Sequence, residues 1–208
     1  MGTPVTIRVL LVDDHPVVLG GLGAALQEQD GIDVVARVAS RKEAAQVLAT
    51  LEVDVALVDI RLPDGSGLDL ISTPLPSANP AWIVLSSFDN PQYVVAAVKL
   101  GAAGYLLKTA PLQKIVDAVR AVAAGGTTFE ARQLRAVHGT APVTLSAQER
   151  SVMREVLAGR SNAEISAKMG IAQKTVEAHL TRLFDRFQVT SRLELALRAE
   201  REGWLDVS

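Results

Sequence analysis

The sequence of 208 residues contains no cysteine. Disulfide bonds and thiolate chemistry are therefore excluded, both for catalysis and for metal binding. A chain that needs no disulfide is expected in the reducing cytoplasm. Aromatic residues are also scarce, at 4% of the chain, whereas hydrophobic residues make up 49%. The chain can therefore bury a sizeable core, and that core must be mostly aliphatic.

Long hydrophobic runs are missing as well. No stretch reaches the roughly 18 apolar residues of a transmembrane helix, so we expect no contact with a membrane. The apolar run near the start is short, carries Arg8 and ends in acidic residues rather than in a small-residue cleavage site. We therefore do not expect a signal peptide.

The net charge of −2 conceals an uneven distribution. Residues 1–125 hold 9 basic and 13 acidic residues, whereas residues 126–208 hold 12 basic and 10 acidic residues. An acidic first part and a mildly basic second part indicate two units with different tasks.

Short apolar runs alternate with amphipathic stretches in the first part. Five runs have the length and composition of strands buried on both faces: Ile7–Val12, Val34–Val38, Val55–Val58, Ile83–Leu85 and Gly104–Leu107. Helices are predicted at Val17–Gln29, Lys42–Thr50, Gln92–Leu100 and Leu112–Ala124. This alternation predicts an α/β unit with a five-stranded, doubly wound parallel sheet. Pro74 and Pro76 predict a short helix and an irregular loop before the fourth strand.

A stretch rich in glycine separates the two parts. Gly125–Gly126 ends the last helix of the first part, and Gly139–Pro142 is rich in turn-forming residues. We place the first domain at residues 5–125, a linker at 126–143 and the second domain at 144–208. Within the linker, a helical turn is expected at Leu134–Val137.

The second domain is predicted to be entirely helical, with four helices. Ser146 is followed three residues later by Glu149, and Ser161 by Glu164, which is the capping-box pattern of helix N-termini. The second of these helices ends at Met169–Gly170, and a longer helix follows after a short turn. This spacing is typical of a helix-turn-helix.

Polar side chains stand where the predicted strands of the first domain end. They are Asp13 and Asp14 after the first strand, Asp59 after the third, Ser86 after the fourth and Lys108 after the fifth. Because the carboxyl ends of parallel strands share one edge of a sheet, these side chains should converge. Three carboxylates make a hard oxygen site suited to Mg²⁺. Such a cation would explain two adjacent aspartates that otherwise repel each other.

Asp59 is the best candidate for a nucleophile, because it ends the central strand and precedes an open turn. An aspartate beside Mg²⁺ can attack phosphorus and form an aspartyl phosphate. The metal and Lys108 would neutralise the phosphoryl oxygens, and the Ser86 hydroxyl would donate a hydrogen bond to them. His15 lies in a loop beside Pro16 and is expected to be exposed, without a chemical role.

Residues 5–125 resemble the receiver domain of two-component response regulators, through the acid pair, "DIRLPDGSG" around Asp59, and "LLKTAP" around Lys108. The resemblance implies that Asp59 is the phosphoacceptor and that Lys108 contacts the phosphoryl group. It implies that Ser86 and Tyr105 form a switch pair. It also implies a set of Mg²⁺ ligands: Asp13, Asp14, Asp59 and the backbone carbonyl of Arg61.

Apolar residues recur at helical spacing in the longer helix of the second domain and are expected to face its core: Val176, Leu180, Leu183 and Phe187. The remaining positions form a polar, partly basic face that would fit a DNA major groove. The residues predicted to contact DNA are Lys174, Thr175, Glu177, Ala178, His179, Thr181, Arg182 and Arg186.

Residues 145–198 resemble the LuxR-type DNA-binding domain of the NarL/FixJ subfamily, through "LSAQE", "LAGRSNAEIS", "KTVEAHL" and "VTSR". Two positions depart from that pattern. Glu177 stands where the family often has lysine, and Ala172 stands where a serine often caps the recognition helix. Losing that cap costs about 1 kcal/mol. In the family, the last helix, expected here at Arg192–Arg201, pairs two DNA-binding domains.

These features indicate a bacterial two-component response regulator rather than an enzyme. A histidine kinase would phosphorylate Asp59 in the presence of Mg²⁺, and homodimers would then bind promoter DNA and regulate transcription. Two alternatives remain open. One is a DNA-binding regulator that works without phosphorylation and uses its receiver-like half only for contacts. The other is a phosphotransferase with an aspartyl nucleophile. It is less favoured because such enzymes usually carry two aspartates in a D-x-D motif, whereas Asp13 and Asp14 are adjacent.

Overall fold

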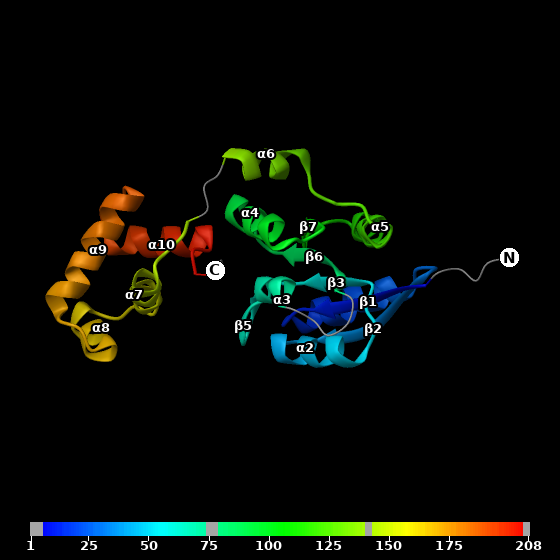
Figure 1. The fold of residues 1–208 in the computed structure, drawn as a ribbon, viewed down its shortest axis with the longest axis horizontal. Coiled ribbons are helices and arrows are strands. Elements are labelled where there is room, and N and C mark those ends of the chain that lie inside the picture. Colours follow the sequence, from blue (N-terminus) through cyan, green and yellow to red (C-terminus); the bar gives the residue numbers. More distant parts are fainter. Residues whose placement is uncertain (1–5, 74–78, 140–142, 206–208) are drawn as a thin grey trace. The chain divides into compact units, whose positions relative to one another are not determined.

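The computed structural model describes residues 6–73, 79–139 and 143–205. The chain divides into two compact units, residues 1–141 and 142–208 (Figure 1). No helix within the described ranges is both long and apolar enough to cross a membrane.

The first unit is built on a five-stranded sheet whose strands pair in parallel in the order β2-β1-β3-β6-β7. The strands are β1 (Ile7–Val12), β2 (Ile32–Val38), β3 (Val55–Val58), β6 (Ala81–Ser86) and β7 (Gly104–Leu107). The predicted doubly wound sheet is therefore confirmed, with slightly longer second and fourth strands. A small antiparallel hairpin, β4 (Arg61–Leu62) and β5 (Gly65–Ser66), lies outside this sheet and was not predicted.

Helices cover both faces of the sheet (Figure 1). They are η1 (Val18–Leu22), α1 (Gly23–Gln27), α2 (Arg41–Thr50), α3 (Leu68–Ser72), α4 (Pro91–Leu100), α5 (Leu112–Ala123) and α6 (Ala131–Gly139). The first predicted helix forms in two parts, because its start is a π-helical segment, η1, that contains Gly20 and Gly21. Glycine weakens a regular α-helix at such positions. Helix α3 is short, as predicted, while Pro74 and Pro76 lie outside the described residues.

Alternate residues of the strands form the core beneath η1, α1 and α5. Val9 and Leu11 of β1 and Val55 and Leu57 of β3 pack there against apolar residues of α5 such as Val119. The intervening strand residues are also buried, so every central strand is apolar on both faces. This double burial explains why the strands appear in the sequence as continuous apolar runs.

The segment after α5 continues along the sheet and then forms α6. The backbone of Thr128 bridges to Gly104 of β7, and α6 packs on α4. The predicted helical turn at Leu134–Val137 is thus part of a longer helix. The residues from Ala131 to His138 include neither glycine nor proline, so nothing in the sequence stops the helix earlier.

The second unit is the predicted set of four helices: α7 (Ala147–Leu157), α8 (Asn162–Met169), α9 (Gln173–Phe187) and α10 (Arg192–Glu202). Both predicted capping boxes are present, at the starts of α7 and α8. The apolar stripe of α9 packs with Val152, Met153, Leu195 and Trp204 in a single core. At Gly170 the backbone adopts the left-handed conformation (φ 66°), which glycine accepts at no steric cost and which turns the chain between α8 and α9.

Candidate functional site

Two buried carboxylates lie side by side at the carboxyl edge of the sheet. Asp13 follows β1 and Asp59 follows β3, and the residues before them, Val12 and Val58, are paired in register. The Asp59 backbone N–H donates to the Val12 carbonyl at 2.9 Å. Both aspartates are buried, whereas Asp14 is exposed. The pair lies at the topological switch point between β1 and β3, where open α/β sheets bind their ligands.

Lys108 connects the two buried carboxylates. Its ammonium nitrogen lies 2.6 Å from Asp13 Oδ2 and 2.8 Å from Asp59 Oδ2. Its backbone N–H donates to the Ser86 carbonyl, which ties the end of β7 to the end of β6. Burial raises the pKa of Asp59, and the hydrogen bond from Lys108 only partly opposes this effect. With Asp14 nearby, three carboxyl groups face one ammonium group.

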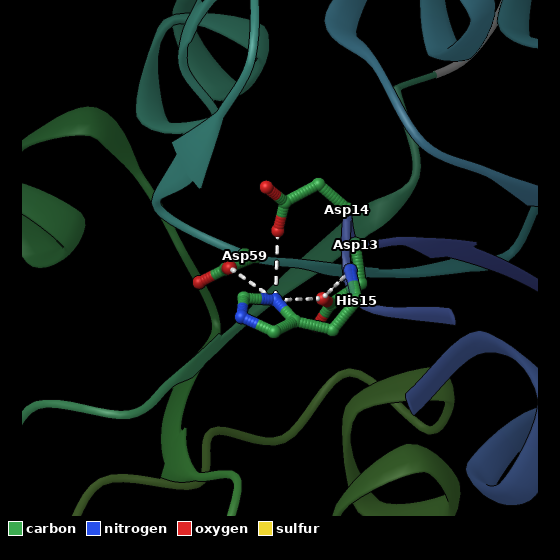
Figure 2. A group of neighbouring side chains, drawn as sticks. All are labelled: Asp13, Asp14, His15 and Asp59. Atoms are coloured by element: carbon green, nitrogen blue, oxygen red, sulfur yellow. Dashed lines mark hydrogen bonds and ion pairs between the residues drawn. The ribbon is translucent and has the colours of Figure 1, made fainter. Parts of the chain in front are cut away.

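This set of three carboxylates and one imidazole fits a divalent cation. Asp13, Asp14, His15 and Asp59 each offer one ligand atom, and these four atoms lie within 4.8 Å of one another (Figure 2). Several carboxylates at this spacing are what a hard divalent ion such as Mg²⁺ binds in proteins. The pocket is therefore an acidic site that can hold a metal ion.

Both residues of the predicted switch pair are buried, and both hold the same loop residue, Phe88. The Ser86 Oγ accepts from the Phe88 N–H at 3.1 Å, and the Tyr105 hydroxyl donates to the Phe88 carbonyl at 2.6 Å. Burial also raises the pKa of Tyr105. The Arg61 guanidinium lies over the Phe88 ring, 4.5 Å from its centroid. The β6–α4 loop is thus held by one residue of β6 and one residue of β7.

The same loop is tied to α6. Arg132 Nη1 forms an ion pair with Asp89 Oδ2, and the Gln133 amide donates to the Tyr105 carbonyl at 3.5 Å. Gln133 is buried, with 4% of its surface exposed. Helix α6 therefore contacts both the loop that the predicted switch residues hold and the strand that carries Tyr105.

The turn after Asp59 is held in place by its neighbours. The Asp64 carboxylate accepts from the backbone N–H groups of Arg41 and Lys42, both at 2.9 Å, and so caps α2. Gly67 has no room for a side chain, since a Cβ atom would lie 1.9 Å from the Asp59 carbonyl oxygen. Arg61 starts the hairpin two residues after Asp59.

The second unit presents the predicted polar face on α9. Val176, Leu180, Leu183 and Phe187 are buried, as predicted from their spacing. The exposed residues of the opposite face are Lys174, Thr175, Glu177, Ala178, Thr181, Arg182 and Arg186, and His179 is partly exposed. No side chain caps the start of α9 at Ala172. Arg186 also has a partner within the domain, because its guanidinium donates to the Thr144 carbonyl at 2.8 Å.

Family models match both units. Residues 9–120 match the response regulator receiver domain, and residues 143–199 match the luxR family of bacterial regulatory proteins. The chain belongs to the LuxR-type response regulators. It is therefore a two-component response regulator with a receiver domain and a DNA-binding domain, the class of protein that regulates transcription.

Curated relatives of this response regulator match along almost its whole length. The transcriptional regulatory protein MctR of Rhizobium johnstonii is 36% identical over 206 residues, which cover 95% of this chain and 94% of MctR. The probable transcriptional regulatory protein NarL of Mycobacterium tuberculosis is 34% identical, with 98% of each chain covered.

Among solved structures, the response regulator ChrA of a haem-sensing two-component system is 31% identical, with a TM-score of 0.54 and coverage of 96% and 99%. RcsB of Salmonella typhimurium shares the fold at 24% identity, with a TM-score of 0.66 and coverage of 95% and 98%.

Several contacts of the response regulator site were missed from the sequence. The Asp64 cap has a local signal, since an Asp-Gly pair after a proline is typical of a turn. The Asp89–Arg132 ion pair joins residues 43 positions apart and has no local signal. His15 was expected to have no chemical role, yet its ring nitrogen points into the acidic pocket (Figure 2).

Proposed function

We propose that a histidine kinase phosphorylates this response regulator on Asp59, with Mg²⁺ held by Asp13, Asp14, Asp59 and the backbone carbonyl of Arg61. The observation that carries the proposal is the contact of Lys108 with both Asp13 and Asp59 at the carboxyl edge of the sheet. A buried carboxylate with a positive partner on one side can receive a phosphoryl group once a divalent cation neutralises the spare negative charge on its other side. Mg²⁺, when bound, neutralises negative charge on the phosphoryl oxygens.

Different residues of the pocket have different roles in phosphoryl transfer. One Asp59 oxygen attacks phosphorus, and the bond between phosphorus and the donor breaks with its electron pair remaining on the donor. The other Asp59 oxygen keeps a protein hydrogen bond, since the two oxygens accept separately from the Ile60 N–H and from Lys108. The Lys108 ammonium group would then form an ion pair with the oxygens of the new phosphoryl group.

The switch pair would report phosphorylation to the linker. The Ser86 oxygen accepts from the Phe88 N–H, and a phosphoryl group on Asp59 would offer an anionic acceptor for the Ser86 O–H. Reorienting Ser86 frees Phe88, and the loop can then move with the Tyr105 side chain that holds it. Movement of the loop would then displace Arg132 of α6 through its ion pair with Asp89.

The output would be DNA binding by a homodimer. The exposed face of α9, from Lys174 to Arg186, would enter the major groove of promoter DNA. Leu193 and Leu197 of α10 lie four residues apart and are 68% and 59% exposed, which supports pairing through this helix. In this account the protein acts in the cytoplasm as a regulator, and its phosphorylation is not enzymatic turnover.

Incubation with acetyl phosphate and Mg²⁺ tests the proposal, with the products separated on a phosphate-affinity gel. We expect a shifted band for the wild type and for Asp117→Asn, an exposed carboxylate of α5 that serves as the control. The shift should disappear in Asp59→Asn and in excess EDTA. A folded wild-type chain that shows no shift, or an unchanged shift in Asp59→Asn, would contradict it.

A further inference from the structure

The imidazole of His15 points into the acidic pocket. Its Nδ1 lies 2.7 Å from Asp14 Oδ1, 2.9 Å from Asp13 Oδ1 and 4.0 Å from Asp59 Oδ2 (Figure 2). The side chain as a whole is 60% exposed, so burial does not force this orientation. The nitrogen nevertheless stands among all three carboxylates.

The backbone fixes His15 at this place. Its N–H donates to Asp13 Oδ1 at 2.9 Å. Its carbonyl accepts from the N–H groups of Val18 and Leu19 at 3.0 and 3.1 Å, which anchors it at the start of η1. The next residue, Pro16, restricts the His15 backbone further. The ring is thus placed beside the pocket by the same turn that places Asp13.

The distances match those between ligands of one octahedral ion. With metal–ligand bonds of about 2.1 Å, neighbouring ligands lie about 3.0 Å apart and opposite ligands about 4.2 Å apart. The hydrogen-bond and ion-pair separations of Nδ1 from Asp14, Asp13 and Asp59, at 2.7, 2.9 and 4.0 Å, lie in the range that ligands of one such ion would need. One ion could therefore bind all four residues without a large movement.

We propose that His15 is a metal ligand of this response regulator, through Nδ1, and that it determines which metal the pocket selects. The inference rests on the metal site of the proposed function and adds a nitrogen donor to it. Nδ1 must then present its lone pair to the ion while Nε2 carries the proton. Lys108 already lies 3.4 Å from Nδ1, so a cation can stand near this nitrogen.

A nitrogen donor changes the metal preference. Mg²⁺ favours oxygen ligands, whereas imidazole binds first-row transition metals well. Mn²⁺ accepts carboxylates and one imidazole in octahedral geometry, so the pocket should bind Mn²⁺ more tightly than Mg²⁺. Removing His15 should weaken Mn²⁺ binding more than Mg²⁺ binding. The dissociation constant for Mg²⁺ divided by that for Mn²⁺ should therefore fall.

The first test measures Mn²⁺ binding to the full chain by the electron paramagnetic resonance signal of the free ion, with Mg²⁺ added in competition. We expect His15→Ala to weaken Mn²⁺ binding about tenfold or more. His179→Ala, which removes a histidine of the other unit, is the matched control and should bind Mn²⁺ like the wild type. Unchanged or tighter Mn²⁺ binding by His15→Ala would overturn the inference, because the ring would then contribute nothing to the ion or would compete with it for its position.

The second test asks whether nitrogen touches the ion. Electron spin echo modulation of the Mn²⁺-loaded wild type should show coupling to ¹⁴N, which changes to ¹⁵N when histidine is labelled and disappears in His15→Ala. Bound Mn²⁺ without nitrogen coupling would overturn the inference and leave the proposed phosphorylation intact. A wild-type chain that binds neither ion would instead contradict the metal site of the proposed function itself.

Discussion

The ammonium nitrogen of Lys108 lies 2.8 Å from an oxygen of Asp59, although the two residues are 49 positions apart in the chain. The contact exists because β3 and β7 end at the same edge of one parallel sheet. It holds the proposed nucleophile and the proposed phosphoryl-binding cation together before any phosphate arrives. Its two partners are both largely buried, at 9% and 7% side-chain exposure, so little solvent competes with it.

Replacing Lys108 by alanine should destabilise the chain in the absence of divalent ions. The change leaves Asp13 and Asp59 facing each other without their shared cation, and losing the partner of a buried charged group costs about 1–3 kcal/mol. Urea denaturation in EDTA measures the loss. Mg²⁺ should restore part of the stability, whereas Lys99→Ala, on the exposed face of α4, should behave like the wild type. A Lys108→Ala chain as stable as the wild type in EDTA would refute the pairing.

Asp59→Asn should stabilise the metal-free chain at pH 7. Burial raises the pKa of Asp59, so the folded chain binds this proton more tightly than the unfolded chain. The free energy of unfolding then falls as pH rises through the folded-state pKa of Asp59. Asparagine has no such proton to lose, and Lys108 keeps its contact with Asp13.

The stabilisation by Asp59→Asn should therefore shrink as the pH is lowered toward about 4, near the ordinary pKa of an aspartate. Urea titrations of both chains at several pH values in EDTA would show this trend. Asp117→Asn should show no comparable trend. A gain that grows on acidification would mean that the folded-state pKa of Asp59 is lowered rather than raised.

Arg132→Ala should loosen α6 with little effect on the rest of the receiver domain. The ion pair with Asp89 is half-exposed, so its loss should cost less than about 1 kcal/mol. Hydrogen exchange of the α6 amides should nevertheless become faster, because the helix loses a tie to the β6–α4 loop. Arg135→Ala, on the same helix and exposed, is the control. Equal exchange in the two variants would show that the ion pair does not hold α6.

Ala172→Ser should stabilise the DNA-binding domain. Ala172 has the extended backbone of a helix N-cap (φ −64°, ψ 144°) but offers no side-chain acceptor. A serine there could accept from a backbone N–H at the start of α9, as Ser161 does for α8. The expected gain is about 1 kcal/mol in the free energy of unfolding. Ala172→Val, which adds no hydroxyl and is as poor an N-cap as alanine, should show no such gain.

The sequence allowed the sheet and the acidic edge to be predicted for a physical reason. Strands buried on both faces must be apolar throughout, so Val55–Val58 could be recognised as a strand without any partner in view. Polar residues directly after such runs, such as Asp59 and Lys108, then had to lie at one edge of the sheet. The apolar spacing of α9 was equally informative, because one face of that helix fills the core.

Features that depend on distant contacts escaped prediction. Helix α6 gains its position from α4, and Arg132 gains its partner from a loop 43 residues earlier. His15 is a different case, because its orientation depends on its sequence neighbours Asp13 and Asp14. It escaped prediction because a histidine beside a proline has no local pattern that distinguishes a ligand from an exposed side chain. The π-helical start of the first helix likewise has only a weak signal, in Gly20 and Gly21.

One measurement tests most directly whether phosphorylation of Asp59 controls DNA binding. A DNA fragment is selected from a random library with the acetyl phosphate-treated wild-type chain, and its affinity is then measured by fluorescence anisotropy at fixed salt, before and after phosphorylation. We predict tighter binding after phosphorylation of the wild type and no change on the same treatment of Asp59→Asn. Equal affinity of the phosphorylated and unphosphorylated wild type would contradict this account and favour a regulator that binds DNA without phosphorylation.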